Sequence, residues 1–187
     1  MDFSNVKAIA VHLDIDEERL TTELESIPDA LWDSGVDNKT ETYWNTIWLT
    51  KNEIDKFPDF KTAKSITHDA WCWDENLEIP YIKSLVESLP VENVGMVRAF
   101  ILDGPLPMHV DSNKTTPSDI SYKMGLTIAS RLEEPMQMQG GIEVKEKVVF
   151  FDDSIPHGFP NAKGKQISIR VFGDFDYYQF SIGKVYQ

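Results

Sequence analysis

The sequence predicts a mainly β protein, with an antiparallel sandwich or barrel in its C-terminal half and flanking helices from its N-terminal half. Five strand-like segments follow one another after residue 93, with no helical pattern between them. Loops rich in Gly, Pro, Asp and Asn separate these segments, which is typical of antiparallel sheets rather than of βαβ units. The two helical patterns both lie before residue 90.

The composition is that of an ordinary globular protein. With 187 residues, of which 41% are hydrophobic and 26% charged, the chain is long enough to bury one good core. We expect residues 1–187 to form a single domain. Its N-terminal part, 1–93, is predicted to be helix-rich with some strands, and its β core to cover 94–176.

Charge and cysteine content narrow the class of partner and the compartment. The net charge of −13 argues against binding to nucleic acid or to an anionic membrane, because both are themselves acidic. The single cysteine, Cys72, excludes an internal disulfide and fits a reducing cytoplasm. No signal peptide and no membrane span is recognisable. We therefore expect a cytoplasmic protein, whose oligomeric state the sequence leaves open.

Two segments of the first half have strand character. Residues 6–15 and 43–49 are rich in β-branched and aromatic side chains. The stretch 33–42 between them, DSGVDNKTET, is polar and predicts a loop. Residues 50–68 are mixed in character and predict no particular element.

Two helices are predicted from apolar residues at a spacing of three and four. The first follows a capping carboxylate, Asp14 or Asp16, and places Leu20 and Leu24 on one side. The second covers residues 79–89, with one proline in its first turn and another directly after it.

The segment Trp71-Cys72-Trp73 has two interpretations. Large aromatic side chains usually pack in a core, so this segment is expected to join a helix–sheet contact. Alternatively it forms a wall of a substrate pocket. Cys72 itself is expected to be inert.

Five strands are predicted in the second half, over 94–102, 122–129, 142–144, 147–151 and 166–172. In the last strand polar and apolar residues alternate strictly. Ser168 and Arg170 therefore share one face, while Ile167, Ile169 and Val171 share the other. A guanidinium and a hydroxyl on one strand face can together hold a small carboxylate.

Two histidines and one carboxylate follow predicted strands. His109 and Asp111 come after the strand 94–102, and His157 comes after the strand 147–151, on an expected loop. In extended backbone, the side chains of residues two apart point the same way, so His109 and Asp111 can coordinate one ion. Two imidazoles and one carboxylate on one face of Fe(II) leave three adjacent positions open, which is the arrangement of non-haem iron oxygenases.

Taken singly, these residues have ordinary structural explanations as solvated, capping or salt-bridged side chains. Their order favours a site: His-X-Asp follows one strand, the second histidine follows a later strand, and the arginine lies thirteen residues beyond it on the next strand. Asp152 and Asp153 are expected to cap the turn before His157 rather than to bind metal. Arg98, on a strand, is a candidate for a substrate carboxylate and equally for an ion pair.

Four segments of the second half share motifs with one enzyme family. They are FDDSIPH (151–157), ISIRVFGD (167–174), RAFILDGPLPMH (98–109) and YKMGLT (122–127). Together they resemble the aspartyl/asparaginyl β-hydroxylases, a family of Fe(II)- and 2-oxoglutarate-dependent dioxygenases. The FDDS-x-x-H stretch is the most specific match, and the resemblance extends over about residues 94–176.

The resemblance implies a double-stranded β-helix, a jelly-roll or cupin-like fold. It also implies an enzyme that binds Fe(II) and 2-oxoglutarate, uses O2 and hydroxylates an amino-acid carbon. His109 and His157 match the family's metal ligands. Asp111 matches the carboxylate ligand of the wider 2-oxoglutarate oxygenases, although some β-hydroxylases have no acid there.

The resemblance also assigns the cosubstrate contacts. Arg170 matches the arginine that pairs with the distal carboxylate of 2-oxoglutarate, a bidentate contact that suits a guanidinium. Ser168 could donate to the same carboxylate. Lys123 stands where the family has a further cosubstrate arginine, so the details of that contact differ here.

Two alternatives remain open from the sequence. A cupin-type metal enzyme that does not use 2-oxoglutarate would bind iron without needing Arg170. A non-enzymatic β-helix binding module would use the histidines structurally. For an enzyme, the absence of a tandem-repeat module favours a small amino acid or peptide as substrate over an extended protein. The loop 112–121 and the N-terminal half are expected to line its pocket.

Overall fold

The computed structural model describes residues 5–37, 42–52, 67–111 and 124–187. Within these ranges the chain forms the helices α1 (Glu17–Ser26) and α3 (Pro80–Glu87), and neither these nor any other described helix is long and apolar enough to cross a membrane. The strands are β1 (Ala8–His12), β2 (Asp33–Asp37), β3 (Thr42–Trp48), β4 (Thr50–Asn52), β5 (Trp71–Trp73), β6 (Val91–Asp103), β7 (Leu106–His109), β8 (Met124–Arg131), β9 (Met136–Met138), β10 (Ile142–Val144), β11 (Val148–Asp152), β12 (His157–Phe159), β13 (Lys165–Phe175) and β14 (Ser181–Tyr186). Single 3₁₀ turns cover Asp29–Leu31, His68–Ala70 and Tyr177–Gln179.

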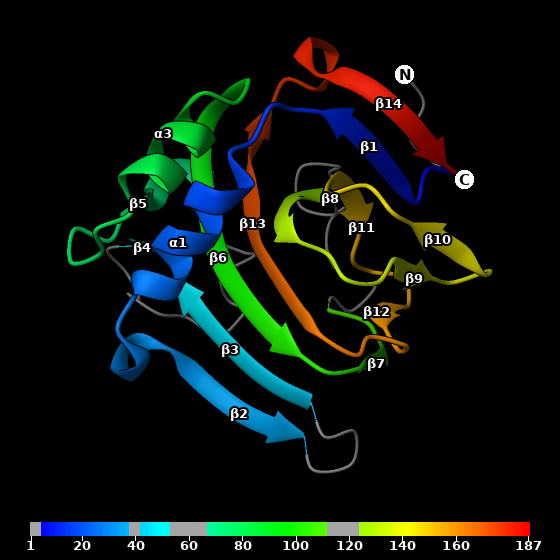
Figure 1. Ribbon diagram of the computed structural model, residues 1–187. Helices are drawn as coiled ribbons and strands as arrows, with labels where there is room; N and C mark the ends of the chain where they lie inside the picture. The colour runs from blue at the N-terminus through cyan, green and yellow to red at the C-terminus, as the bar shows by residue number, and fades with distance from the viewer. Residues whose placement is uncertain (1–4, 38–41, 53–66, 112–123) are drawn as a thin grey trace.

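Two antiparallel sheets form the body of the molecule, a double-stranded β-helix of the jelly-roll type (Figure 1). The larger sheet has the strand order β14-β1-β11-β8-β13-β6-β3-β2, and the smaller sheet the order β10-β9-β12-β7. β4 and β5 pair separately. In Figure 1 the helices lie on one side of the larger sheet and the smaller sheet lies on the other. The predicted fold class, a mainly β, cupin-like core with N-terminal flanking helices, is confirmed.

The helices cover the larger sheet with the apolar sides that the sequence predicts. α1 begins after Asp16, whose carboxylate accepts a hydrogen bond from the backbone N–H of Arg19, so Asp16 rather than Asp14 is the cap. α3 has Pro80 at its start, where a missing N–H costs no hydrogen bond. The buried residues of this layer include Leu20, Leu24, Ile82, Val86, Leu126, Ile128, Ile167 and Ile169.

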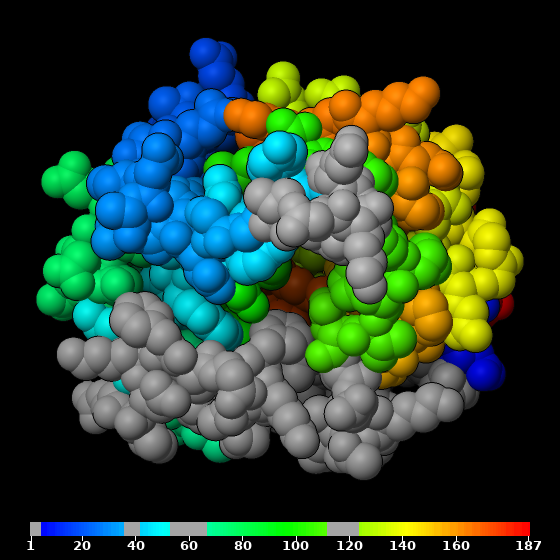
Figure 2. Space-filling model, turned by 90° about the horizontal axis from the view of Figure 1, so that it is seen from below, coloured from blue at the N-terminus to red at the C-terminus, as the bar shows by residue number. Residues whose placement is uncertain are grey.

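A second apolar layer lies between the two sheets. It joins β11 of the larger sheet to β9 and β10 of the smaller one through Val149, Phe151, Met136, Met138 and Val144. Seen from below, the molecule is hollowed, with the orange-brown β13 at the base of the hollow and β3, β6 and β7 beside it (Figure 2). The space between the sheets is therefore apolar in one part and open in another.

Most predicted elements of the second half lie where the sequence places them. β6, β8, β10, β11 and β13 overlap the five predicted strands, and residues 122–123 of the second one lie outside the described residues. The sequence does not predict β7, β9, β12 or β14, of which the first three are only three or four residues long and show no periodicity. The larger sheet combines β1, β2 and β3 from before residue 93 with five later strands.

Two local predictions are wrong. Residues 33–42, predicted as a loop, contain β2, which pairs with β3 at the edge of the larger sheet. An edge strand can be polar on both sides, so its composition conceals it. His157, expected on a loop, begins β12 instead, because it pairs with β7 on one side and with β9 on the other.

The Trp71-Cys72-Trp73 segment forms β5, one strand of the separate pair. Trp71 is buried against Met96 and Phe172, and its ring stacks on that of Trp48 with 5.7 Å between centroids. This packing agrees with the core interpretation of the segment. Cys72 is an exposed free thiol.

Candidate metal centre

Strand pairing in the smaller sheet brings the two histidines together. β7 ends at His109 and β12 begins at His157, and these two residues are direct partners in the antiparallel register. Their rings lie 4.6 Å apart between centroids. The close approach depends on Gly158, because a Cβ there would lie 2.7 Å from the carbonyl oxygen of Pro107.

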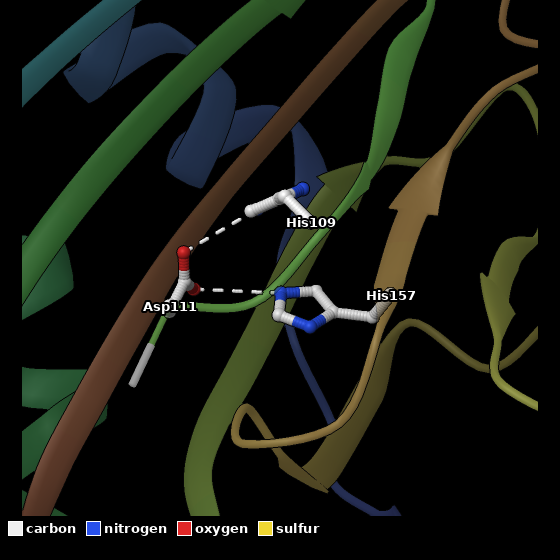
Figure 3. A group of neighbouring side chains, drawn as sticks. All are labelled: His109, Asp111 and His157. Carbon is white, nitrogen blue, oxygen red and sulfur yellow. Dashed lines mark ion pairs between the residues drawn. The ribbon is translucent and has the colours of Figure 1, made fainter. Parts of the chain in front are cut away.

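Asp111 completes the group just beyond β7. Its Oδ1 lies 3.3 Å from Nε2 of His109 and its Oδ2 lies 3.4 Å from Nε2 of His157 (Figure 3). One ligand atom from each residue falls within 4.8 Å of the others. The structure thus brings together the three residues for which the sequence predicts a metal site, and we call them the His-Asp-His group.

Backbone contacts orient both imidazoles. Nδ1 of His109 lies 2.9 Å from the carbonyl oxygen of Pro107, and Nδ1 of His157 lies 3.0 Å from that of Ile155. A carbonyl oxygen can only accept, so each Nδ1 must donate its proton. In the neutral ring Nε2 then carries the lone pair that can bind a metal, whereas a protonated ring donates its Nε2–H to Asp111, which both Nε2 atoms face. The contact of each Nδ1 with a backbone carbonyl oxygen fixes the tautomer of the ring, as is usual for metal-ligating histidines.

The electrostatics of the group keep its carboxylate ionised. Burial acts to raise the pKa of Asp111, but hydrogen bonds with His109 and His157 and the charge of Arg170 outweigh it and hold the pKa well below its usual range. The hydrogen bond to Asp111 is the largest of the influences that raise the pKa of His109. Asp111 is thus a carboxylate at neutral pH, ready to bind a cation.

Arg170 projects from β13 toward the same carboxylate. Its Nη1 lies 3.4 Å from Oδ2 of Asp111, and its Nη2 lies 3.4 Å from Oδ2 of Asp153. The guanidinium carbon lies 3.9 Å from the centroid of the Phe151 ring. Gly125 leaves room for it, since a Cβ at that position would lie 2.8 Å from Nε of Arg170. The arginine is buried and held on several sides.

Arg98 lies directly opposite Arg170 in the pairing of β6 with β13. Its Nη2 donates a hydrogen bond of 2.7 Å to Oγ1 of Thr46, and its guanidinium lies over the rings of Trp48 and Phe100. Burial lowers the pKa of Arg98, against the opposite influence of nearby carboxylates. Two arginines from neighbouring strands therefore stand side by side near the His-Asp-His group.

The structure describes only one of the other two predicted cosubstrate residues, Ser168 and Lys123. Ser168 lies on the same face of β13 as Arg170 and lines a small pocket with Thr127, Met136 and Phe159. Its contact with a cosubstrate stays a prediction. Lys123 lies outside the described residues, as does the loop 112–121.

The fold is similar to that of a solved protein, a prolyl-4-hydroxylase of Pseudomonas putida. The similarity has a TM-score of 0.51 and covers 93% of this chain and 95% of that one, at 11% sequence identity. No family model matches the sequence, and no curated protein matches it either. At this identity the similarity concerns the fold.

The donor set fits an iron ion. Two imidazole nitrogens and one carboxylate, grouped on one side, form the facial arrangement of non-haem Fe(II) oxygenases. Nε and Nη2 of Arg170 are buried and have no hydrogen-bond acceptor among the residues that the structure describes. These two N–H groups form one edge of the guanidinium and match the two oxygens of a carboxylate. The site therefore fits both Fe(II) and a carboxylate-bearing cosubstrate.

The sequence did not reveal what holds Arg170. Asp152 caps the turn as expected, since its Oδ1 accepts hydrogen bonds from the backbone N–H and hydroxyl of Ser154. Asp153 does more than the sequence predicts, because its carboxylate is fully buried beside Arg170. The one available signal was a pair of acidic residues directly after the apolar run ending at Phe151.

Proposed function

We propose that this chain is an Fe(II)- and 2-oxoglutarate-dependent dioxygenase that hydroxylates an amino-acid carbon. One observation carries the proposal. The His-Asp-His group brings two Nε2 atoms and a carboxylate within 4.8 Å of one another. The buried Arg170 beside it makes no hydrogen bond through Nε or Nη2 among the described residues, and its Nη2 is ion-paired with Asp153. The fold similarity to a prolyl-4-hydroxylase supports the same class, and the FDDS-x-x-H stretch supports the aspartyl/asparaginyl β-hydroxylase family.

Each residue of the group has a distinct task in this proposal. His109, Asp111 and His157 hold Fe(II) through Nε2, a carboxylate oxygen and Nε2. The backbone carbonyls behind the two imidazoles keep the rings in the ligating tautomer. The charge of Asp111 offsets part of the charge of the metal. Loss of either histidine would leave two ligands, too few for a stable site.

Arg170 recognises the distal carboxylate of 2-oxoglutarate. Phe151 covers one face of the guanidinium and Phe172 lies 5.1 Å from it, so water has little access and the ionic contact is strengthened. With both groups bound, iron and 2-oxoglutarate supply the oxidation: one oxygen atom of O2 enters succinate, the other enters the substrate C–H bond, and CO2 leaves. The protein supplies binding and orientation.

Arg98 is the proposed contact for a carboxylate of the substrate. It lies next to Arg170 in the sheet, and its buried Nε has no hydrogen-bond partner among the described residues. The rings of Trp48 and Phe100 flank its guanidinium and would border a small apolar side chain. A free amino acid or short peptide fits this arrangement, and screening such compounds for succinate release tests it.

The deciding experiment is an anaerobic titration of the protein with Fe(II) and then with 2-oxoglutarate. We expect the weak visible charge-transfer band of an iron-chelated 2-oxo acid. His109→Ala and His157→Ala should lose Fe(II) binding while their far-ultraviolet circular dichroism stays unchanged. Arg170→Ala should keep iron but need about 10- to 100-fold more 2-oxoglutarate, corresponding to a charged hydrogen bond of about 1.5–3 kcal/mol.

His12→Ala is the matched control, because His12 is an exposed histidine on β1 and not part of the group. It should behave as the wild type. If iron binds and no band forms, the cosubstrate assignment fails and a cupin-type metal enzyme without 2-oxoglutarate becomes the better explanation. If the wild type binds no iron, the chain is a non-enzymatic binding module with structural histidines.

A further inference from the structure

Asp153 is an acidic side chain with no exposure to solvent. A carboxylate removed from water costs several kcal/mol unless a cation and hydrogen bonds compensate for it. The cation is Arg170, whose Nη2 lies 3.4 Å from Oδ2 of Asp153. Asp153 follows β11 directly, so the end of one strand of the larger sheet is tied to the middle of another, β13.

The same residue also contacts the metal-binding segment. The carbonyl oxygen of Asp153 accepts a hydrogen bond of 3.1 Å from the backbone N–H of Asp111. Asp153 thus reaches Arg170 with its side chain and Asp111 with its main chain. A residue that does both fixes the position of the arginine relative to the His-Asp-His group.

The surroundings restrict the guanidinium to one orientation. The guanidinium carbon lies over the Phe151 ring, 3.9 Å from its centroid, and the absence of a side chain at Gly125 leaves space at Nε. Packing against a ring fixes the plane of a guanidinium but leaves it free to turn within that plane. The carboxylate of Asp153 opposes that turning. Each Nη carries two hydrogens, so this contact still leaves one Nη2 hydrogen, together with Nε–H, for a ligand.

A second carboxylate, that of Asp111, competes with Asp153 for the guanidinium of Arg170. Among the described residues, the carboxylates within 4 Å of Arg170 are those of Asp153 and Asp111. Without the charge of Asp153, the arginine would be drawn toward Asp111 alone. It would then turn away from the cosubstrate and compete with the metal for its carboxylate ligand.

We propose that Asp153 is a positioning residue that holds Arg170 in the orientation needed to recognise the distal carboxylate of a 2-oxo acid, and that it thereby sets cosubstrate selectivity. This inference rests on the proposed function. It assigns to the second acid of the FDDS segment a task different from that of the first, Asp152, whose carboxylate caps the turn.

The test compares Asp153→Asn with Asp152→Asn in the whole chain. Asparagine keeps the volume, and at position 152 its amide oxygen can still accept the capping hydrogen bonds. Each Fe(II)-loaded protein is titrated anaerobically with 2-oxoglutarate and with 2-oxovalerate, which has a methyl group in place of the distal carboxylate. Affinity is read from the charge-transfer band and from calorimetry, so the readout does not depend on turnover.

For Asp153→Asn we expect 2-oxoglutarate affinity to fall about 10-fold, the effect of misaligning a charged hydrogen bond, with 2-oxovalerate affinity unchanged. Asp152→Asn should match the wild type for both acids. Equal losses for both acids, or no loss for either, would overturn the proposal. If the wild type itself binds neither iron nor 2-oxoglutarate, the proposed function fails, and the role of Asp153 fails with it.

A double variant keeps the test decisive if a lone buried arginine prevents Asp153→Asn from folding. In an Arg170→Ala background no unpaired cation is left, and Asp153→Asn should then change 2-oxoglutarate affinity by less than about 2-fold, because neighbouring residues that act through one contact are not additive. A further loss of affinity in that background would mean that Asp153 acts by another route, contrary to the proposal.

Discussion

Both faces of β13 contain buried side chains, but the two faces differ in chemistry. On the face toward the helices, Ile167, Ile169 and Val171 are fully buried in the main core. On the other face Arg170 is 5% exposed and Phe172 is 2% exposed. Burial alone therefore does not separate the structural face from the candidate site. The buried charge of Arg170 distinguishes the two faces.

The two faces also differ in whether their buried hydrogen-bond donors have acceptors. The core face has apolar side chains that gain free energy simply by leaving water. The site face contains Arg170, whose Nε and Nη2 lack hydrogen-bond acceptors among the described residues. Such donors cost stability unless a ligand meets them. The site face is therefore expected to gain stability when a ligand binds, whereas the core face is not, and variants on each face test this difference.

The largest effect on stability is expected from Ile169→Ala on the core face. Removing this fully buried side chain should lower the free energy of unfolding by about 2–5 kcal/mol, because it leaves a cavity in a packed layer. Fe(II) and 2-oxoglutarate affinity should stay near wild type at temperatures where the variant is folded. Urea denaturation and the anaerobic titration measure the two quantities.

Ser168→Ala is the control for that experiment, on the neighbouring position of the opposite face. Ser168 is only partly buried, so its loss should change stability by less than about 1 kcal/mol. If Ile169→Ala instead weakened cosubstrate binding as much as stability, the two faces would not be separable, and the comparison would fail.

A smaller effect on stability is expected at Gly158, in the smaller sheet, where β12 pairs with β7. A Cβ there would press on the carbonyl oxygens of Pro107 and Leu106 and force β12 away from β7. Gly158→Ala should lower stability by about 1–3 kcal/mol, the usual cost of overpacking. It should also weaken Fe(II) binding, because His157 moves relative to His109. Thermal unfolding and iron titration would show both changes.

Gly164→Ala is the matched control, since its nearest neighbour is a flexible side-chain atom of Glu133 at 3.4 Å. It should leave iron affinity unchanged. An equal loss of iron binding in both glycine variants would mean that general destabilisation, rather than the pairing of β12 with β7, governs the metal centre.

Sequence reasoning succeeded where periodicity or residue type was strong. The alternation over residues 166–172 predicted both faces of β13, and the histidines and Asp111 were grouped from their order after strands. It failed where the determinant is a pairing distant in sequence. β2 is polar because it is an edge strand, and β12 is a strand only because β7 and β9 flank it. The strand character of β2 and β12 therefore cannot be predicted from the local sequence pattern.

The contacts of Arg170 show the same limit within the site. The sequence identified the arginine and its face, but the carboxylate of Asp153 lies seventeen positions away along the chain and reaches it from another strand end. Nothing in the spacing distinguishes Asp153 from Asp152, and only the fold shows which of them is buried. Residue type pointed to the candidate site, whereas three-dimensional pairing determined how its side chains are arranged.

The smallest effect is expected from Asp174, near the end of β13, where the strand pairing is irregular. Its carboxylate is 44% exposed and contacts Nδ1 of His68 and Nδ2 of Asn93. Burial acts to raise the pKa of Asp174, but these hydrogen bonds outweigh it and lower the pKa. A depressed pKa adds stability above the unfolded value of about 3.9 and loses it as the pH falls through the folded value.

Asp174→Asn should therefore cost less than about 1 kcal/mol at pH 7, because the pair is solvent-screened. The difference from wild type should be constant above about pH 5 and shrink below about pH 4, as the wild-type carboxylate takes up its proton. Urea denaturation across this pH range measures it. If Asp174→Asn lowered the free energy of unfolding as much as Ile169→Ala does, the half-exposed ion pair at the strand end would contribute as much stability as the buried core face. That result would contradict the expected difference between the faces of β13.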